Sequence, residues 1–388
     1  MHISYPITKE ILTHLVSFDV LGGQSNLPIL NYIISILKDH DIPYHLVPNL
    51  QGDKASLHCR IGPDVDGGLV LSGHMDVVPV SGQNWKTEPF ELIENDEKLY
   101  ARGSCDMKGF LACCLASIAT FKNAPLKRPI YFAFSYDEEI GCLAGDELAE
   151  AIMSHYSEKP EFAIIGEPSM MQPVIGQKGI CVLSTTVHGS AGHSSRIKQE
   201  VSAIHVASKL IQWLDQKMDH LISIGKTNHR FIPPHSSLHV GIIQGGIAPN
   251  VIADKCIFFW DVRVIPEDSV QEIIQEFRSY CATLEQDLRL KFEGARIITE
   301  IDHPPVPPLG TLEDSDIVPL IQKITGNTQL TTVAYAAEAG QFSNAGFKTV
   351  ICGPGNIAQA HRANEYVEIN QLCECLSMLE NLAEEFST

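Results

Sequence analysis

Apolar residues recur with two different periods along the first 176 residues of the chain. Short apolar runs predict strands, whereas apolar residues at helical spacing predict helices. The runs predict strands over residues 43–47, 56–61, 69–72, 98–100, 129–135 and 162–165, and the helical spacing predicts helices over 7–18, 27–38, 110–121 and 145–154. Strands that alternate with helices predict an α/β domain built around one sheet.

Three of these predicted strands end in histidine or acidic residues. The strand that begins at Leu69 leads to His74 and Asp76, the strand over 129–135 precedes Glu138 and Glu139, and the strand over 162–165 precedes Glu167. Open α/β sheets bind their ligands beyond the carboxyl ends of the strands. In an extended His-x-Asp pair both side chains point to the same side, so Asp76 is placed to steady the His74 ring.

From about residue 177 the pattern changes to the order β-α-β-β-α-β. It predicts strands over 180–188, 237–244, 252–264 and 288–301, and helices over 201–220 and 269–284. This order is typical of a ferredoxin-like domain. We therefore expect a first catalytic segment over 1–176, an inserted domain over 177–302, and a return to the catalytic domain over 303–388, with helices over 317–325 and 371–386 and a strand over 349–352.

Composition narrows the class of protein. A chain of 388 residues is long for a single core, which agrees with two domains. The net charge of −19 argues against nucleic acid or an anionic membrane surface as a partner. No apolar run is long enough to cross a membrane. The 11 scattered cysteines and the lack of a signal-peptide pattern indicate a reduced, cytoplasmic protein.

Five residues with metal-binding side chains lie at predicted strand ends or in adjacent loops: His74, Asp106, Glu139, Glu167 and His361. Each alone has a simpler explanation, such as a helix cap for Asp106 or a surface position for Glu139. Clustered carboxylates repel one another unless cations neutralise them, so convergence of all five favours a metal. Three carboxylates and two imidazoles suit two zinc ions or similar borderline metals.

Several motifs resemble those of the co-catalytic zinc aminoacylase and carboxypeptidase family. They are Gly73-His74-Met75-Asp76, the segment from Gly103 to Gly109, Asp137-Glu138-Glu139, Gly166-Glu167-Pro168, and the loop from Gly353 to His361. The resemblance covers nearly the whole chain. It implies a zinc-peptidase-like mixed sheet flanked by helices, with an inserted ferredoxin-like α+β domain that serves dimerisation.

The resemblance also implies how the metals are held. His74 and Glu167 bind one metal, Glu139 and His361 bind the other, and Asp106 bridges the two. It implies two zinc ions per chain, with cobalt or manganese able to substitute for them.

In the same family resemblance, Glu138 is the general base and Asp76 is the partner of the His74 ring. The peptide bond that follows Asp106 is expected to be cis. Cys105 departs from the family pattern, in which a small residue such as alanine is more usual. This departure leaves the set of ligands intact and places a thiol near the metals.

Three further residues of the inserted domain match family positions that contact the substrate. His193 matches a histidine that stabilises the oxyanion from the partner subunit, which implies a homodimer. Asn250 and Arg263 match substrate-binding positions, and Arg263 is suited to bind a carboxylate. A purely structural role stays open for two of these residues. His193 could simply begin a helix, and Arg263 could simply form a salt bridge within the sheet.

The implied activity is hydrolysis of the amide bond of an N-acyl amino acid. Four segments favour the members that convert N-acetyl-L-ornithine to L-ornithine and acetate in arginine biosynthesis: residues 85–90, 176–179, 337–338 and 353–365. Glu338 is suited to attract the δ-ammonium group, unless it faces solvent or pairs with a lysine. Lys178 is a further candidate for substrate binding. It is the one basic residue of a turn, residues 176–179, in which members that remove succinyl groups tend to offer arginines, so the turn favours the acetyl substrate.

Two alternatives to this activity remain at this point. One is another deacylase of the family, above all a succinyl-diaminopimelate desuccinylase. The other is a catalytically silent metal-binding scaffold on the same fold. A scaffold has no need of a base beside a metal ligand, so the presence of Glu138 argues against the second alternative.

Overall fold

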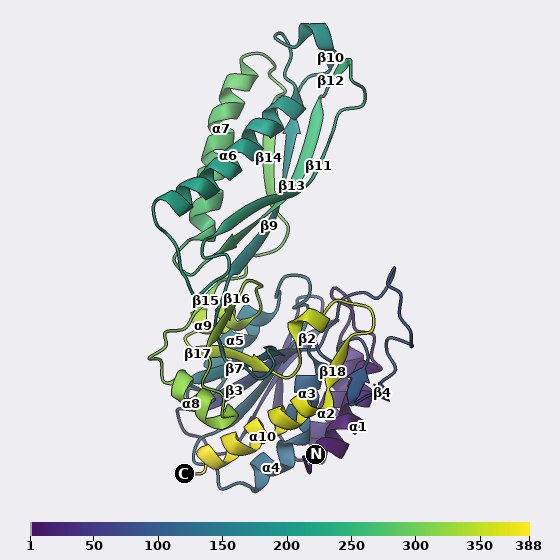
Figure 1. Cartoon of the computed structure of the whole chain (residues 1–388), viewed down its shortest axis with the longest axis vertical. Coiled ribbons are helices and arrows are strands. Elements are labelled where there is room, and N and C mark those ends of the chain that lie inside the picture. The colour runs from purple at the N-terminus through teal and green to yellow at the C-terminus, as the bar shows by residue number, and fades with distance from the viewer. Residues whose placement is uncertain (1) are drawn as a thin grey trace. The chain divides into compact units, whose positions relative to one another are not determined.

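Four parallel strands form the centre of a nine-stranded mixed sheet (Figure 1). The computed structural model describes residues 2–388. The sheet order is β1 (Tyr44–Pro48), β2 (Ala55–Ile61), β6 (Ile130–Ser135), β3 (Leu69–His74), β7 (Phe162–Pro168), β17 (Lys348–Gly353), β8 (Val174–Gln177) and β15 (Leu309–Gly310), and β16 (Thr331–Val333) also pairs with β8. Strands β6, β3, β7 and β17 are mutually parallel, and the flanking strands pair antiparallel. The predicted mixed α/β sheet is confirmed.

Helices cover this sheet and carry the apolar faces that the sequence pattern predicted. They are α1 (Tyr5–Val16), α2 (Leu27–Asp39), α3 (Lys108–Ala116), α4 (Ile118–Asn123), α5 (Gly145–His155), α8 (Ile317–Thr325), α9 (Ala339–Asn344) and α10 (Ile369–Glu385). Helix α3 packs on β3 and in turn contacts α1 and α10. All its residues are buried, which explains its nearly uniform apolar sequence. Within residues 2–388, no helix combines the length and apolarity that a membrane span requires.

A small second sheet combines two strands within residues 93–100 with one strand near the carboxyl end of the chain. It has the order β18 (Tyr366–Glu368), β5 (Lys98–Tyr100) and β4 (Ile93–Asn95). The pairing of β18 with β5 brings a segment near the carboxyl end beside the segment that precedes Asp106. Two loops that are distant in the sequence therefore become neighbours.

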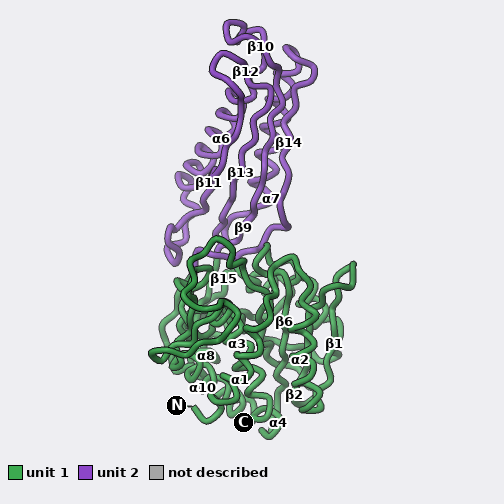
Figure 2. Tube along the Cα trace, turned by 90° about the vertical axis from the view of Figure 1, so that its right-hand side faces the viewer, with its two compact units in different colours: residues 1–177, 309–332, 337–388 green, residues 178–308, 333–336 purple. Residues whose placement is uncertain are grey.

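The chain divides into two compact units (Figure 2). Unit 1 contains the residues up to Gln177 together with Leu309–Thr332 and Ala337–Thr388, and unit 2 contains Lys178–Pro308 and Val333–Ala336. Unit 2 thus extends through the proline-rich segment that follows residue 302. It also includes a short segment from the region that the sequence analysis placed in the catalytic domain.

Unit 2 has the strand and helix order of a ferredoxin-like domain. Its main elements are β9 (Gly179–His188), α6 (Ala203–Ser223), β11 (Ser237–Gly245), β13 (Lys255–Val264), α7 (Val270–Arg289) and β14 (Arg296–Ile301). The antiparallel sheet has the order β11-β13-β9-β14. Alternate residues of β9 are buried, and Trp260 of β13 packs against Phe277 of α7. This core is separate from that of unit 1.

Three predicted elements differ from the structure. The helix expected over 110–121 is two helices that meet at Ser117, whose hydroxyl donates a hydrogen bond to the carbonyl of Cys113. Hydroxyl side chains compete in this way for helix carbonyls. The strand expected over 288–301 begins at Arg296, because α7 continues to Arg289. The strand expected over 252–264 is divided into β12 (Val251–Ile252) and β13.

Gly166 lies in β7 immediately before Glu167, where the strand passes close to helix α3. A Cβ atom at Gly166 would lie 2.1 Å from Cδ1 of Phe110, which is fully buried. Glycine therefore permits the close approach of strand and helix beneath one of the predicted metal ligands.

We expect Gly166→Ala to destabilise unit 1, since overpacking a buried site costs about 1–3 kcal/mol. The midpoint of urea unfolding should fall, and adding Phe110→Leu should restore part of the loss. Gly241→Ala is the control, because a Cβ there lies no closer than 3.7 Å to a neighbouring atom. An unchanged midpoint in Gly166→Ala would show that the close approach does not limit stability.

Candidate metal centre

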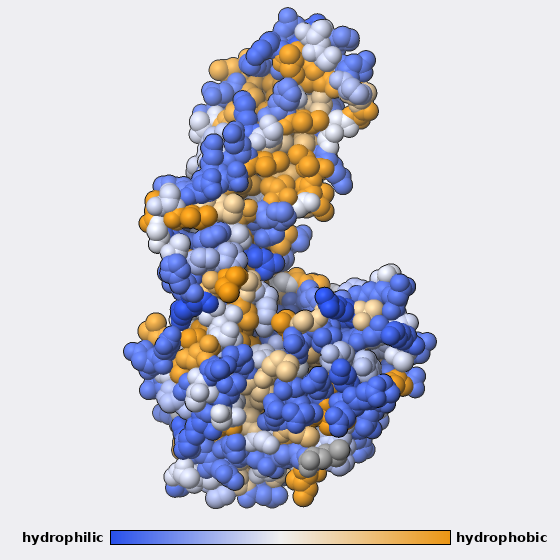
Figure 3. All heavy atoms as spheres, viewed as in Figure 1, coloured by the Kyte–Doolittle hydropathy of each residue, from blue (hydrophilic) through white to orange (hydrophobic). Residues whose placement is uncertain are grey.

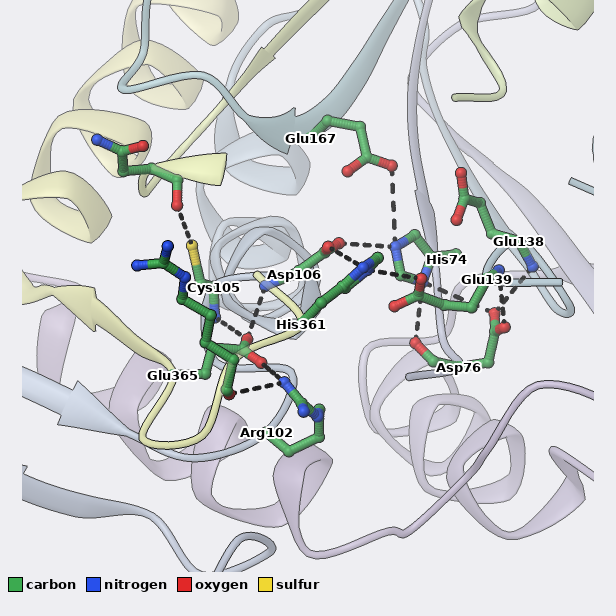
Figure 4. A network of polar contacts seen from close by, with 12 residues as sticks. His74, Asp76, Arg102, Cys105, Asp106, Glu138, Glu139, Glu167, His361 and Glu365 are labelled. Carbon is green, nitrogen blue, oxygen red and sulfur yellow. Dashed lines mark hydrogen bonds and ion pairs between the residues drawn. The ribbon is translucent and has the colours of Figure 1, made fainter. Parts of the chain in front are cut away.

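The four parallel strands deliver the predicted ligands to one edge of the sheet. Strand β3 ends at His74, β7 carries Glu167, and Glu139 lies in the loop that follows β6. Strand β17 precedes the loop that contains His361. Figure 4 shows these side chains pointing toward one another around Asp106, which lies just before α3.

Asp106 lies between two histidines and offers one oxygen to each. Its Oδ1 is 3.0 Å from Nε2 of His74, and its Oδ2 is 3.5 Å from Nε2 of His361. Nε2 of His74 is also 3.8 Å from Glu167, and Nε2 of His361 is 3.0 Å from Glu139. Donors around a tetrahedral zinc ion with bonds of about 2.1 Å are about 3.4 Å apart. The spacing of these atoms is therefore in the range of donors around a metal ion, and these residues form a candidate metal centre.

Electrostatics also favour bound cations at this position. Burial raises the pKa of Glu167 well above its usual value, and Asp106 and Glu138 add to the shift. Burial likewise raises the pKa of Glu139, with a further contribution from Asp106. The hydrogen bond to Glu139 raises the pKa of His361 to about 9. Cations between these groups would relieve the repulsion among the carboxylates, so the donor set fits a metal centre.

Asp76 orients the Glu138–Glu139 segment. Its Oδ1 and Oδ2 accept hydrogen bonds from the backbone N–H groups of Glu138 and Glu139, each at 3.1 Å. Nδ1 of His74 lies 2.9 Å from the backbone carbonyl of Asp76, but 3.7 Å from its carboxylate. The backbone of Asp76 thus contacts the His74 ring, while its carboxylate anchors the loop that carries the predicted base.

Glu138 itself is surrounded by groups that favour its neutral form. Burial raises its pKa well above the usual value, and the charges of Glu139 and Glu338 add to this effect, although His74 opposes it. The thiol of Cys142 donates a hydrogen bond of 3.3 Å to Oε1 of Glu138. A carboxyl group beside candidate metal ligands is placed to accept a proton and to release it again.

The sequence analysis did not identify the partners of the Asp106 loop. Glu365 accepts hydrogen bonds from the backbone N–H groups of Cys105 and Asp106, and it forms a buried ion pair with Arg102. Arg102 and Glu365 each adjoin a glycine-rich motif, but no local sequence pattern indicates that the two side chains form a pair. The peptide bond between Asp106 and Met107 is cis, as the family resemblance implied.

The Cys105 thiol is poorly suited to bind a metal. Its Sγ donates a hydrogen bond of 3.4 Å to the carbonyl of Asn356. Burial raises the pKa of this thiol well above its usual value, and Glu365 adds to the shift. A protonated thiol is a poor metal ligand.

Unit 2 places its predicted residues in two clusters. His193 of β10 (Gly192–His193) pairs with Val251 of β12, next to Asn250, whose carbonyl accepts a hydrogen bond from Ser194. Lys178 and Arg263 lie at the opposite end of β9, where Arg263 pairs with Ile180. Ten residues of strand separate the clusters by about 30 Å.

The cluster at the start of β9 contains two positively charged side chains, those of Lys178 and Arg263. Nζ of Lys178 donates a hydrogen bond to the carbonyl of His235 at 2.6 Å, and Nη1 of Arg263 donates one to Ala334 at 3.3 Å. Burial lowers the pKa of Lys178, and the charge of Arg263 lowers it further. Nε of Arg263 also lies 3.7 Å from Asp261, which is the salt bridge that the sequence left open.

Glu338 is a buried residue of unit 1. Only 1% of it is exposed, so it neither faces solvent nor belongs to a surface ion pair. Its Oε1 has no hydrogen-bond partner within residues 2–388. Burial raises the pKa of Glu338 to about 7.

Comparisons with known proteins extend over both units. The model of "Peptidase family M20/M25/M40" matches residues 70–385. The chain is 32% identical to a protein named acetylornithine deacetylase from Myxococcus xanthus, with 98% of this chain and 97% of that one covered. It is 31% identical to a protein of the same name from Proteus mirabilis, with 100% and 98% covered.

Solved structures show the same fold. That of a tripeptidase from Staphylococcus aureus has a TM-score of 0.76 at 20% identity, with 99% of this chain and 98% of that chain covered. The family that the sequence motifs predicted is therefore confirmed. The chain belongs to peptidase family M20/M25/M40 and is a metallo-amidohydrolase.

Proposed function

We propose that the chain hydrolyses N2-acetyl-L-ornithine to L-ornithine and acetate, a step of arginine biosynthesis. The observation that carries this proposal is the full-length similarity to two proteins named acetylornithine deacetylase. The free thiols of all 11 cysteines agree with a reaction in the reducing cytoplasm.

The proposed cofactor is a pair of zinc ions, for which cobalt or manganese can substitute. His74 and Glu167 would hold one ion, Glu139 and His361 the other, and Asp106 both. The separations of 3.0–3.8 Å among their donor atoms support this division. Mixed nitrogen and oxygen ligands suit these metals better than magnesium or calcium.

Glu138 is the proposed general base. When bound, the two cations would acidify a water molecule and polarise the amide carbonyl. Because Oε1 of Glu138 accepts the Cys142 hydrogen bond, Oε2 is free to take the proton from the attacking water. The same carboxyl group then donates that proton to the nitrogen of the leaving amine. Asp76 holds the backbone of Glu138 in place during both transfers.

Residues of unit 2 are proposed to bind the rest of the substrate. Lys178 and Arg263 present two neighbouring cations, which suits the α-carboxylate of the amino acid. His193 is proposed to donate a hydrogen bond to the oxyanion, with Asn250 beside it. A substrate of this size cannot contact both clusters of one unit across about 30 Å. His193 would therefore act on a substrate held by the partner subunit.

The sheet of unit 2 offers a surface for such a homodimer. Strand β11 is an edge strand, and Ile242, Ile243 and Ile247 are 52%, 50% and 88% exposed on it and just beyond it. Figure 3 shows apolar side chains gathered over this sheet. An exposed apolar edge strand is a ready template for pairing with another chain.

Replacing Glu138 by glutamine should keep the metals and abolish most of the turnover. Glutamine preserves the shape of the side chain but cannot accept the proton, and general-base catalysis is worth about 10²–10⁴-fold. Elemental analysis should still find about two metal ions per chain. The exposed Glu150→Gln variant of α5 should match the unchanged protein in both measurements. Turnover of Glu138→Gln within a few-fold of the unchanged protein would assign the base to another group.

The kcat/KM for N2-acetyl-L-ornithine should exceed that for succinyl-diaminopimelate by at least about tenfold, which requires about 1.4 kcal/mol of transition-state binding. Glu338→Gln should reduce the preference for acetylornithine over acetylnorvaline, which lacks the δ-ammonium group. Glu150→Gln again serves as the control. Equal use of the succinyl substrate would reject the proposed substrate, and an unchanged preference in Glu338→Gln would remove Glu338 from substrate recognition.

Mixing His193→Ala chains with Glu138→Gln chains should restore activity if His193 acts across the dimer. Each variant alone should be nearly inactive. In random hybrids half of the dimers carry one competent site, so about a quarter of the original turnover should return. Two different affinity tags verify that subunits have exchanged. Absence of recovery in proven hybrids would place His193 in the site of its own chain or outside catalysis.

A further inference from the structure

A buried ion pair joins the two loops that carry Asp106 and His361. Nη1 of Arg102 lies 2.6 Å from Oε2 of Glu365, and both side chains are 1% exposed. Oε1 of Glu365 accepts hydrogen bonds of 2.9 and 3.0 Å from the N–H groups of Cys105 and Asp106. Glu365 thus fixes the backbone on the amino side of the proposed bridging ligand (Figure 4).

The Nη2 group of Arg102 is linked through Gln83 to the loop that carries His361. Nη2 of Arg102 donates a hydrogen bond of 2.7 Å to Oε1 of Gln83, and Nε2 of Gln83 donates one of 2.8 Å to the carbonyl of His361. Trp85 donates a further hydrogen bond to Oε1 of Gln83 and lies against the Arg102 guanidinium. The orientation of the Gln83 amide is therefore determined by donors on one end and an acceptor on the other.

His361 depends on such support more than the other ligands do. It lies in a loop, with a positive φ of 61° and a side chain that is 57% exposed. His74 and Glu167, in contrast, lie in buried strands. A left-handed conformation is unfavourable for a residue with a side chain, so contacts to the backbone must hold it.

We propose that Gln83 is a positioning residue that sets the affinity of the metal position formed by Glu139 and His361. It acts through the carbonyl of His361, and the Arg102–Glu365 pair holds it in place. This inference rests on the proposed division of the ligands between two cations. The side-chain hydrogen bonds of Gln83 go to Trp85, Arg102 and His361, so the position formed by His74 and Glu167 should be independent of it.

The test is a zinc titration of the metal-free protein against a chromophoric chelator, which resolves two stepwise dissociation constants. Gln83→Ala should weaken one constant by about 10–100-fold, the usual effect of losing a contact that orients a ligand. The other constant should change less than about twofold. His361→Ala identifies which constant belongs to the His361 position, and adding Gln83→Ala to it should cause little further loss.

Two further variants separate this effect from a general loss of structure. Gln83→Glu keeps an acceptor for Arg102 but removes the donor to His361, so it should show the same selective weakening without a lower unfolding midpoint of the metal-free protein. Gln51→Ala is the control, because this exposed glutamine lies in the turn between β1 and β2, where it accepts a hydrogen bond from the Asn49 side chain.

The possible outcomes are distinguishable. Equal weakening of both constants, or no weakening, in Gln83→Ala and Gln83→Glu would overturn the role of Gln83. Uptake of fewer than two zinc ions by the unchanged protein would instead reject the proposed pair of cations, and this inference with it.

Discussion

Repulsion among buried carboxylates is the constraint on which this structure depends. Asp106, Glu138, Glu139 and Glu167 converge at one sheet edge, and burial together with their mutual charge disfavours ionisation of the three glutamates. Hydrogen bonds from backbone N–H groups to other acidic side chains hold these segments in place. Asp76 accepts hydrogen bonds from the backbone N–H groups of Glu138 and Glu139, and Glu365 accepts one from the backbone N–H group of Asp106. These hydrogen bonds fix the backbone from which the carboxylates project.

The topology of the sheet explains which residues of the site could be predicted from the sequence. His74, Glu139 and Glu167 follow apolar runs, and parallel strands necessarily present their carboxyl ends along one edge. Arg102 and Glu365 were not predicted as a pair because 263 positions separate them along the chain. No local periodicity reports a contact of that kind. It depends on the small β18-β5 pairing, whose strands are three residues long.

The same distinction applies to the fold. Strands β3 and β6 were predicted because both faces are buried and their sequences are continuously apolar. The break between α3 and α4 was not predicted, since the apolar residues continue on both sides of Ser117, where the two helices meet. The end of α7 was placed too early because Leu288 was assigned to the following strand, although the helix continues through the polar residues 285–287 as far as Arg289. Pattern thus predicts buried elements well and their solvated ends poorly.

The length of β9 has a consequence for how this chain tolerates insertions and deletions. Its ten residues alternate strictly between buried and half-buried, and they pair with β13 on one side and β14 on the other. Removal of a single residue would turn every later side chain to the opposite face. The span between the two ends of the sheet can therefore change only in steps of two residues, made together in adjoining strands. Related chains should accordingly vary in their loops while keeping this span constant.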